Sequence, residues 1–278
     1  MRRWLGEVTL VLIAIPIVLW TFIPLYHLFI LAISPQDSVL AGDLWPEHPT
    51  FTNFLTVFRQ QHYYLSNFWL QLGNSFLIAV STGVLTLFVA TCAAFAISRL
   101  RAPGGRTVMN LALSTYLIPA AFLAVPMYKT MGTYGLLDTQ AALILAMIAL
   151  ASPYAIWVLK QASDKLPREL DEAAIMDGAK PLQIFRMVYL PLMRPSLVAI
   201  GIYALLLAWN EYLYAFLLLS SEKAAPLSVG LGLFLSADDS PWNLLMATGL
   251  IYAVPPAVIY YVFRNAMTSG LTAGAVKG

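Results

Sequence analysis

Charged side chains gather in one short segment of an otherwise apolar chain. The segment Lys160–Arg194 holds five of the 14 acidic residues and six of the 16 basic ones. Pro167 stands where a first helical residue is expected. Carboxylates in the next turns would favour a helix dipole, and three follow: Glu169, Asp171 and Glu172. Gly178 is a suitable C-terminal stop. The pattern predicts a short acidic helix ending at a glycine turn.

A second short helix is predicted from Pro181, ending before Pro191. Its apolar residues form two neighbouring faces, one with Leu182, Phe185 and Tyr189 and the other with Ile184 and Val188. Helices this short are not stable alone, so the pair must pack on something. Two surfaces suit its mixed apolar and charged character: a soluble partner protein, or an anionic lipid surface.

Residue patterns for catalysis are missing from the sequence. It has no glycine-rich loop followed by Lys and Ser or Thr, so the chain is not expected to hydrolyse ATP itself. The histidines His27, His48 and His62 are scattered and make no metal-binding spacing. Neither an HExxH motif nor a serine elbow is found, which disfavours a membrane enzyme. We therefore expect no catalytic residue, metal site or cofactor in this chain.

The composition indicates the environment of the rest of the chain, outside the charged segment. Of 278 residues, 60% are hydrophobic and only 11% charged, with a mean hydropathy of +0.74. So few charges could not cover a water-facing surface, and disorder would need the opposite balance. A net charge of +2 gives no indication of nucleic-acid binding. The one cysteine, Cys92, lies in an apolar run and can form no internal disulfide. These values predict a polytopic membrane protein.

Six apolar stretches are long enough to cross a bilayer as helices. They are Val8–Gln36, Leu72–Ile97, Thr107–Tyr128, Thr139–Leu159, Pro195–Ser221 and Ser240–Phe263. The first follows Arg2 and Arg3 as in a signal peptide, but it is longer than a signal-peptide core and lacks a clean cleavage site, so we expect it to be retained. Proline pairs predict kinks in the third and sixth spans, at Pro119 and Pro126 and at Pro255–Pro256.

The distribution of basic residues predicts the orientation. With the N-terminus inside, 13 of the 16 basic residues fall in cytoplasmic segments, and only Arg59, Lys129 and Lys223 fall outside. Both termini are then cytoplasmic, and so is the charged segment. The first outer segment, about Ser34–Tyr64, is expected to fold as a hairpin or short helix.

Glu211 is the only acidic residue inside a predicted span, beside Trp209 and Asn210. Charges within a membrane usually face a cavity or a partner, so the three residues are candidates for a pathway or gate, with a structural role favoured over substrate contact. Aromatic residues could stack on a sugar ring, although membrane interfaces and helix cores use them more often. The candidates are Trp69, Tyr116, Tyr128, Tyr203 and Trp209.

The charged segment resembles the EAA loop of binding-protein-dependent ABC importers. The family pattern is EAA, three residues, Gly, nine residues, Ile, any residue, Leu-Pro. Here it reads Glu172, Ala173, Ala174, Ile175, Met176, Asp177, Gly178, then Val188 in place of Ile, Leu190 and Pro191. The string Ala208–Tyr212 and the tail Gly270–Gly278 are similar to the shorter of the two permeases in the carbohydrate-uptake branch.

The resemblance implies an all-α type I importer permease fold (MetI-like) with six transmembrane helices. It implies a heterodimer with a second permease subunit, two ATPase subunits that carry ATP and Mg²⁺, and an extracytoplasmic solute-binding protein. The EAA loop would couple the ATPase to the membrane helices, with Glu172 pairing with a basic residue and Gly178 allowing a close turn. The expected location is the cytoplasmic or inner membrane of a bacterium or archaeon, with lipid around the chain and no nucleic acid.

Two further contacts are implied by the resemblance. The loop Glu222–Asp239 would reach the binding protein, with Gly230 and Gly232 fitting a cleft, and Gly270–Gly278 would enter between the ATPases. The alternatives are a plain connector and a frayed terminus. We expect three parts: 1–66 with the first span and outer loop, 67–265 as the permease core with the coupling loop 160–194, and 266–278 as the tail.

The predicted function is one half of a sugar translocation pathway. A permease for glycerol phosphate or another small polar solute is the alternative. A stand-alone secondary transporter is remote, because it would predict internal repeats, and no convincing repeat is found.

Overall fold

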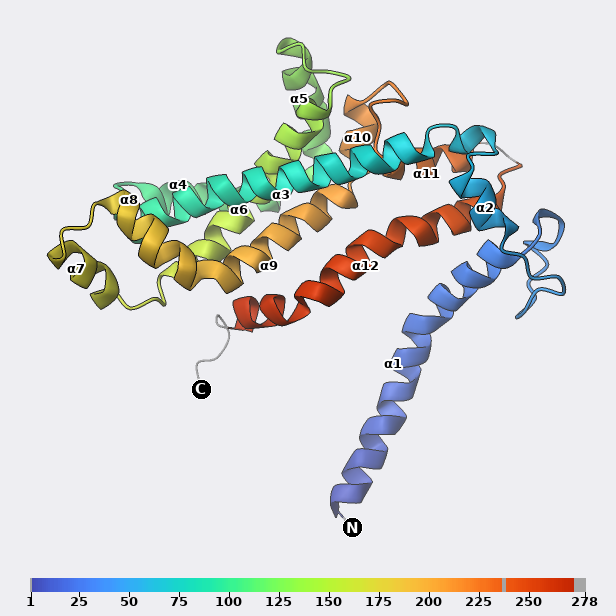
Figure 1. Cartoon of the computed structure of the whole chain (residues 1–278), viewed down its shortest axis with the longest axis horizontal. Helices are drawn as coiled ribbons and strands as arrows, with labels where there is room; N and C mark the ends of the chain where they lie inside the picture. The colour runs from blue at the N-terminus through green and yellow to red at the C-terminus, as the bar shows by residue number, and fades with distance from the viewer. Residues whose placement is uncertain (1, 237–238, 273–278) are drawn as a thin grey trace. The chain divides into compact units, whose positions relative to one another are not determined.

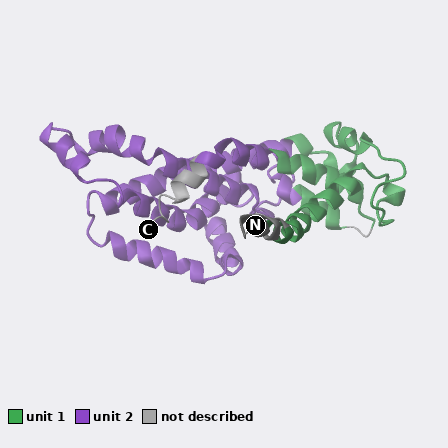
Figure 2. Ribbon diagram, turned by 90° about the horizontal axis from the view of Figure 1, so that it is seen from below, with its two compact units in different colours: residues 1–69, 230–254 green, residues 70–229, 255–278 purple. Residues whose placement is uncertain are grey.

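The computed structural model describes residues 2–236 and 239–272, and every regular element in them is helical (Figure 1). Two compact units contain the chain: residues 1–69 with 230–254, and 70–229 with 255–278 (Figure 2). The first boundary lies close to the predicted one after residue 66, but 230–254 joins the first unit, so the units are not the three predicted parts. That three-part division stays a prediction.

The first unit contains α1 (Arg2–Ile33), α2 (Thr52–Phe58) and the beginning of α12 (Trp242–Thr272). Single helical turns at Gln36–Ser38 and Tyr63–Leu65 flank α2, so the segment between α1 and α3 takes the second of its two expected forms, a hairpin or a short helix. Asn53 ties α2 to the end of α1, because its amide donates to the carbonyls of Ala32 and Ser34 at 2.8 and 2.9 Å. Its side-chain oxygen accepts from Asn243 at 3.0 Å, which joins α12 to the same centre.

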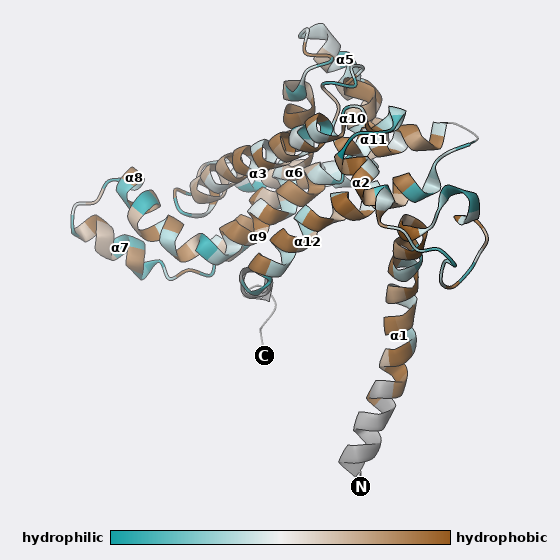
Figure 3. Ribbon diagram, turned by 45° about the vertical axis from the view of Figure 1, so that its right-hand side comes forward, coloured by the Kyte–Doolittle hydropathy of each residue, from teal (hydrophilic) through white to brown (hydrophobic). Residues whose placement is uncertain are grey.

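The second unit is built on three long helices, α3 (Phe68–Ser98), α6 (Gln140–Ser163) and α9 (Leu190–Trp209). They lie side by side, and a core cluster joins them (Figure 1). Small residues allow α3 and α9 to approach closely: a Cβ added to Gly201 would lie 2.9 Å from Leu87. In Figure 3 the apolar colour follows these helices, and polar colour marks α8 (Pro181–Gln183) in the charged segment.

The third predicted span is broken rather than kinked. Helix α4 (Gly105–Ser114), with a further turn to Leu117, and helix α5 (Ala120–Thr133) meet at 109°. Ile118 before the break is extended, as the residue before a proline prefers, and Pro119 caps α5. The described residues contain five continuous helices that could span a membrane, or six if this bent pair counts as one.

The fifth predicted span also differs, at both ends. It does not begin at Pro195, because a π-helical turn (Ile184–Tyr189) joins α8 to α9 without a break, so the second short helix does not end before Pro191. Leu190 donates its N–H to the carbonyl of Phe185 in that turn. Pro191 then follows at the beginning of α9, directly after this turn. At the other end the helix ends at Trp209, and a short helix, α10 (Leu213–Leu218), follows.

Candidate functional site

The charged segment folds as predicted around its first helix. Helix α7 (Glu169–Met176) begins two residues after Pro167 rather than at it, and all three predicted acidic residues lie in its first turn. Gly178 ends it with a left-handed φ of +82° and donates to the carbonyl of Ile175 at 2.9 Å. Glycine adopts this conformation without steric cost. In α8, the side chain of Gln183 accepts a hydrogen bond from the N–H of Lys180 at 2.7 Å.

One face of α7 is fixed to the end of α3 by Arg99. Its guanidinium forms an ion pair with Asp171 at 3.0 Å and donates to the carbonyl of Leu166 at 3.2 Å. Both side chains are largely buried, with 6% and 18% of their surfaces exposed. Nearby, the hydroxyls of Ser98 and Ser163 are 2.5 Å apart, which joins α3 to α6. Sequence reasoning counted Arg99 only as an inside charge, although its place directly after the second apolar run was an available signal.

The outer face of α7 has no cover from the described chain. Glu172, Ala173 and Asp177 are exposed, while Ala174 is half-buried. Large apolar side chains are exposed beside them, including Ile175 at 58% and Met176 at 87%. Apolar side chains this exposed at the end of a charged helix are typical of a contact surface. We call this surface the α7 face; that it packs on a partner stays a prediction.

Behind α7, an aromatic cluster connects the loop to the long helices. Phe185 and Tyr189 in the π-helical turn both lie 5.0 Å, centre to centre, from the ring of Phe95 in α3. Tyr189 is buried and packs with Met193 in the core cluster. Leu190 is half-buried and Pro191 exposed, so these two motif residues shape the backbone more than the surface. A displacement of the loop would act directly on α3 and α9.

The residues Trp209, Asn210 and Glu211 form the break between α9 and α10. Asn210 donates its side-chain amide to Leu206 at 2.9 Å, and Glu211 accepts the N–H of Tyr214 at 2.8 Å. The carbonyl of Glu211 accepts from Ser228 at 2.7 Å. Trp209 is buried against Phe76. These contacts give all three a local structural role, and their predicted part in a pathway or gate stays a prediction.

The predicted binding-protein loop is helical where it was expected to be a loop. Gly230 and Gly232 lie within α11 (Leu227–Leu233), and Gly230 is buried. Apolar residues at helical spacing, such as Leu227 and Leu231, explain the helix, which the glycines masked in the sequence. Exposed side chains of this segment lie instead at its two ends, at Glu222, Lys223 and Leu235.

Comparison with known families decides the identity of the chain. The family described as the inner membrane component of binding-protein-dependent transport systems matches residues 87–272, which include the whole charged segment. The chain belongs to this family. It is a multi-pass membrane component of an ABC importer, as the family and its apolar helices show together.

Named relatives match this permease over nearly its full length. The inner membrane ABC transporter permease protein YcjP of Escherichia coli is 32% identical, with 94% of each chain covered. The trehalose transport system permease protein SugB of Mycobacterium tuberculosis is 33% identical, with 93% of each covered. A crystal structure of a bacterial ABC transporter involved in the import of alginate matches with a TM-score of 0.78 at 26% identity, covering 95% of this chain and 96% of the other. The all-α importer permease fold is confirmed.

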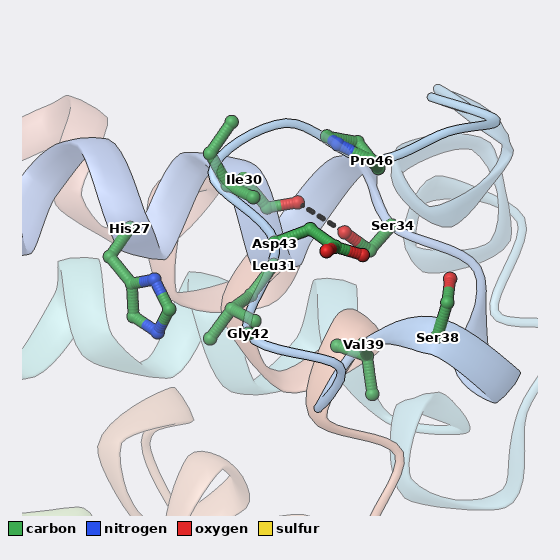
Figure 4. Close-up of a pocket in the computed structure, with 9 residues that line it drawn as sticks. All are labelled: His27, Ile30, Leu31, Ser34, Ser38, Val39, Gly42, Asp43 and Pro46. Carbon is green, nitrogen blue, oxygen red and sulfur yellow. Dashed lines mark hydrogen bonds between the residues drawn. The ribbon is translucent and has the colours of Figure 1, made fainter.

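Other parts of the permease give weaker evidence for a functional site. Among the described residues no group of His, Cys, Asp and Glu could hold a metal ion. A cavity at the end of α1 is lined by His27 and Asp43, with Ser34 donating to the carbonyl of Ile30 at 2.8 Å (Figure 4). Its volume of about 10 Å³ has room for no more than a single water. The last six residues of the predicted tail insertion, 273–278, lie outside the described residues.

Proposed function

We propose that this permease forms half of the translocation pathway for a sugar or a sugar derivative. Support comes from relatives of nearly the same length whose names specify trehalose, trehalose/maltose and diacetylchitobiose. The other half is a second permease subunit. Apolar surface that the chain itself leaves exposed is available for contacts with that subunit and with lipid. Only 6% of the apolar stretch in α1 is buried, against 44% of that in α6.

The α7 face is the surface that couples this permease to an ATPase. The observation that supports this best is that Arg99 fixes one side of α7 while Glu172, Ile175 and Met176 of the same helix stay exposed. A groove with a basic residue for Glu172 and an apolar floor for Met176 complements this surface. Closure of two ATPase subunits would push α7, and the aromatic cluster around Phe95 would transmit the movement to α3 and α9. ATP and Mg²⁺ belong to those subunits.

The orientation follows from the same assignment. With α7 in the cytoplasm, both termini are cytoplasmic, in agreement with the 13 basic residues counted on that side. The segment Glu222–Asp239 is then extracytoplasmic and faces the solute-binding protein. Because Gly230 is buried in α11, exposed side chains nearer the beginning of the segment, such as Lys223, would make the contact.

The test compares two acidic residues of the same helix. Glu172→Ala removes the carboxylate of the EAA motif, and Glu169→Ala removes another exposed carboxylate one turn earlier. In importer complexes reconstituted into proteoliposomes, we expect Glu172→Ala to lower ATP-dependent uptake about tenfold or to release the ATPase on purification. Glu169→Ala should keep both within about twofold. Equal behaviour of the two variants would contradict the coupling role.

The substrate class is tested separately, on the solute-binding protein of the same importer. Thermal-shift screening of that protein against mono- and oligosaccharides, glycerol phosphate and amino acids should give a stabilising sugar. A positive result with glycerol phosphate alone would replace the sugar by that solute without affecting the coupling role of α7.

A further inference from the structure

A basic cavity of about 320 Å³ lies within the second unit, and Arg168, the residue before α7, is part of its lining. It is formed where three membrane helices end or begin: the C-terminal end of α3, the N-terminal end of α4 and the C-terminal end of α6. Its charged lining consists of Arg101, Arg106, Lys160, Asp164 and Arg168. We call it the arginine pocket. Neither the coupling role of α7 nor the sugar pathway uses these side chains.

Charge in the arginine pocket is unbalanced. Its single carboxylate, Asp164, is paired with the buried Lys160 at 2.5 Å. In the described part of the chain, Arg101, Arg106 and Arg168 have no acidic partner within ion-pair distance. The pocket thus carries a net charge of about +3 and has three exposed guanidinium groups at its rim. A multiply hydrogen-bonding anion such as phosphate complements this arrangement.

The backbone of the pocket favours the same ligand. Helix α4 begins in it, with Gly104 at a φ of +75° in the cap position and no acidic side chain in the first turn. The first N–H groups of a helix attract anions. Gly105 is required there, because a Cβ would lie 2.9 Å from Ile97. The helix end therefore adds donors to the three arginines.

Exposed apolar side chains continue from the pocket along α4. Val108 is 66% exposed and Leu111 64%, and they lie two and five residues after Arg106. A ligand that satisfies both surfaces has a phosphate at one end and hydrocarbon at the other. Basic pockets between membrane helices at the cytoplasmic side are suited to anionic lipid head groups. We propose that the arginine pocket binds the phosphate of an anionic phospholipid, with its acyl chains along α4.

Occupation of the pocket would affect the start of α7. The carbonyl of Arg168 accepts from Asp171 at 2.9 Å and from Glu172 at 3.1 Å, so this residue opens the helix. A head group on its guanidinium would tie the beginning of α7 to the ends of α3 and α4. The lipid is therefore a ligand that holds the coupling helix in place from the membrane side.

Lipid binding is measured by native mass spectrometry on the purified importer complex. Phosphatidylglycerol and phosphatidylcholine with the same acyl chains are added in parallel. We expect tight retention of phosphatidylglycerol and not of phosphatidylcholine. The triple variant Arg101→Gln, Arg106→Gln and Arg168→Gln should bind phosphatidylglycerol about hundredfold more weakly, at about fivefold for each arginine. Arg194→Gln, which removes an exposed arginine outside the pocket, should leave binding unchanged.

Further variants and a competing ligand distinguish binding of a lipid from binding of a free phosphate and from an effect of charge alone. Replacing the three arginines by lysine keeps the charge, and binding should stay within about tenfold of the unaltered protein. If the glutamine triple variant does not assemble, Arg106→Gln alone should show a fivefold loss. Equal retention of the two lipids, or undiminished binding by the glutamine variants, would overturn the proposal. Displacement of phosphatidylglycerol by inorganic phosphate at matching concentration would overturn the lipid assignment in favour of a free phosphate.

Discussion

Arg99 is the residue on which the position of α7 depends most directly. Its guanidinium serves two segments at once, through the carboxylate of Asp171 and the carbonyl of Leu166. An arginine can do this because its donors lie in a planar fork. Loss of the side chain would leave a largely buried carboxylate without its partner, which costs more than the pair contributes when intact.

We therefore expect Arg99→Met to loosen α7 without unfolding the membrane helices. Removing one partner of a buried pair costs about 3–5 kcal/mol, and the partial exposure of Asp171 reduces this to about 2 kcal/mol. Hydrogen exchange of the α7 amides should accelerate about thirtyfold, while exchange in the buried part of α6 stays unchanged. Asp171→Asn can still accept a hydrogen bond from Arg99, so its α7 exchange rate should lie between those of the unaltered protein and of Arg99→Met. Unchanged exchange in α7 would show that Arg99 is not its anchor.

Substitutions of Glu211 can distinguish a structural role of its side chain from a role in proton transfer or substrate binding. Its carboxylate caps α10 by accepting the N–H of Tyr214. Glu211→Ala should cost about 1 kcal/mol, the usual effect of losing a helix cap, and lower the unfolding temperature by a few degrees. Glu211→Gln keeps an acceptor oxygen and should preserve both stability and uptake. A glutamine variant that folds normally but does not transport would show that the charge itself is needed.

At the scale of elements, the turn at Gly178 determines where α7 ends. Gly178→Ala would place a Cβ on a residue with a φ of +82°, at a cost of about 1–2 kcal/mol, and the turn would shift. We expect ATP-dependent uptake to fall at least fivefold, with ATPase activity less responsive to the binding protein. Gly135→Ala is the matched control, because Gly135 has a φ of +67° and, like Gly178, open space around it, but lies in the turn after α5. An equal loss of coupling in both variants would point to general destabilisation.

Elements defined by local signals could be predicted, and those defined by tertiary contacts could not. The acidic first turn of α7 and the stop at Gly178 depend on the helix dipole and on backbone sterics, which are local. The π-helical turn depends on Phe185 and Tyr189 packing on Phe95, about 90 residues earlier in the sequence. The pairing of Arg99 with Asp171 is likewise invisible without the fold.

Hydropathy alone could not place the breaks within the apolar runs. A run of mostly apolar residues predicts a span but does not show whether its backbone continues, and both α4–α5 and α9–α10 are apolar enough to be read as single spans. Pro119 did indicate a disturbance, but its size of 109° depends on what surrounds it. Glu211 was taken as a charge inside a span because the break around it was not foreseen.

For the whole molecule, the proposed orientation places Met176 and Leu40 on opposite sides of the membrane. Both side chains are exposed, at 87% and 72%, so either position should accept a cysteine. In a background with Cys92→Ala, and with the ATPase subunits stripped from the membranes because they would cover the α7 face, Met176→Cys should react with a membrane-impermeant maleimide only in inside-out vesicles, and Leu40→Cys only in intact spheroplasts. The physical basis is the excess of basic residues on the α7 side, which disfavours translocation of those loops. If both cysteines were labelled from the same side, the number of spans between them would have to be even. The bent α4–α5 pair could then not be a single crossing.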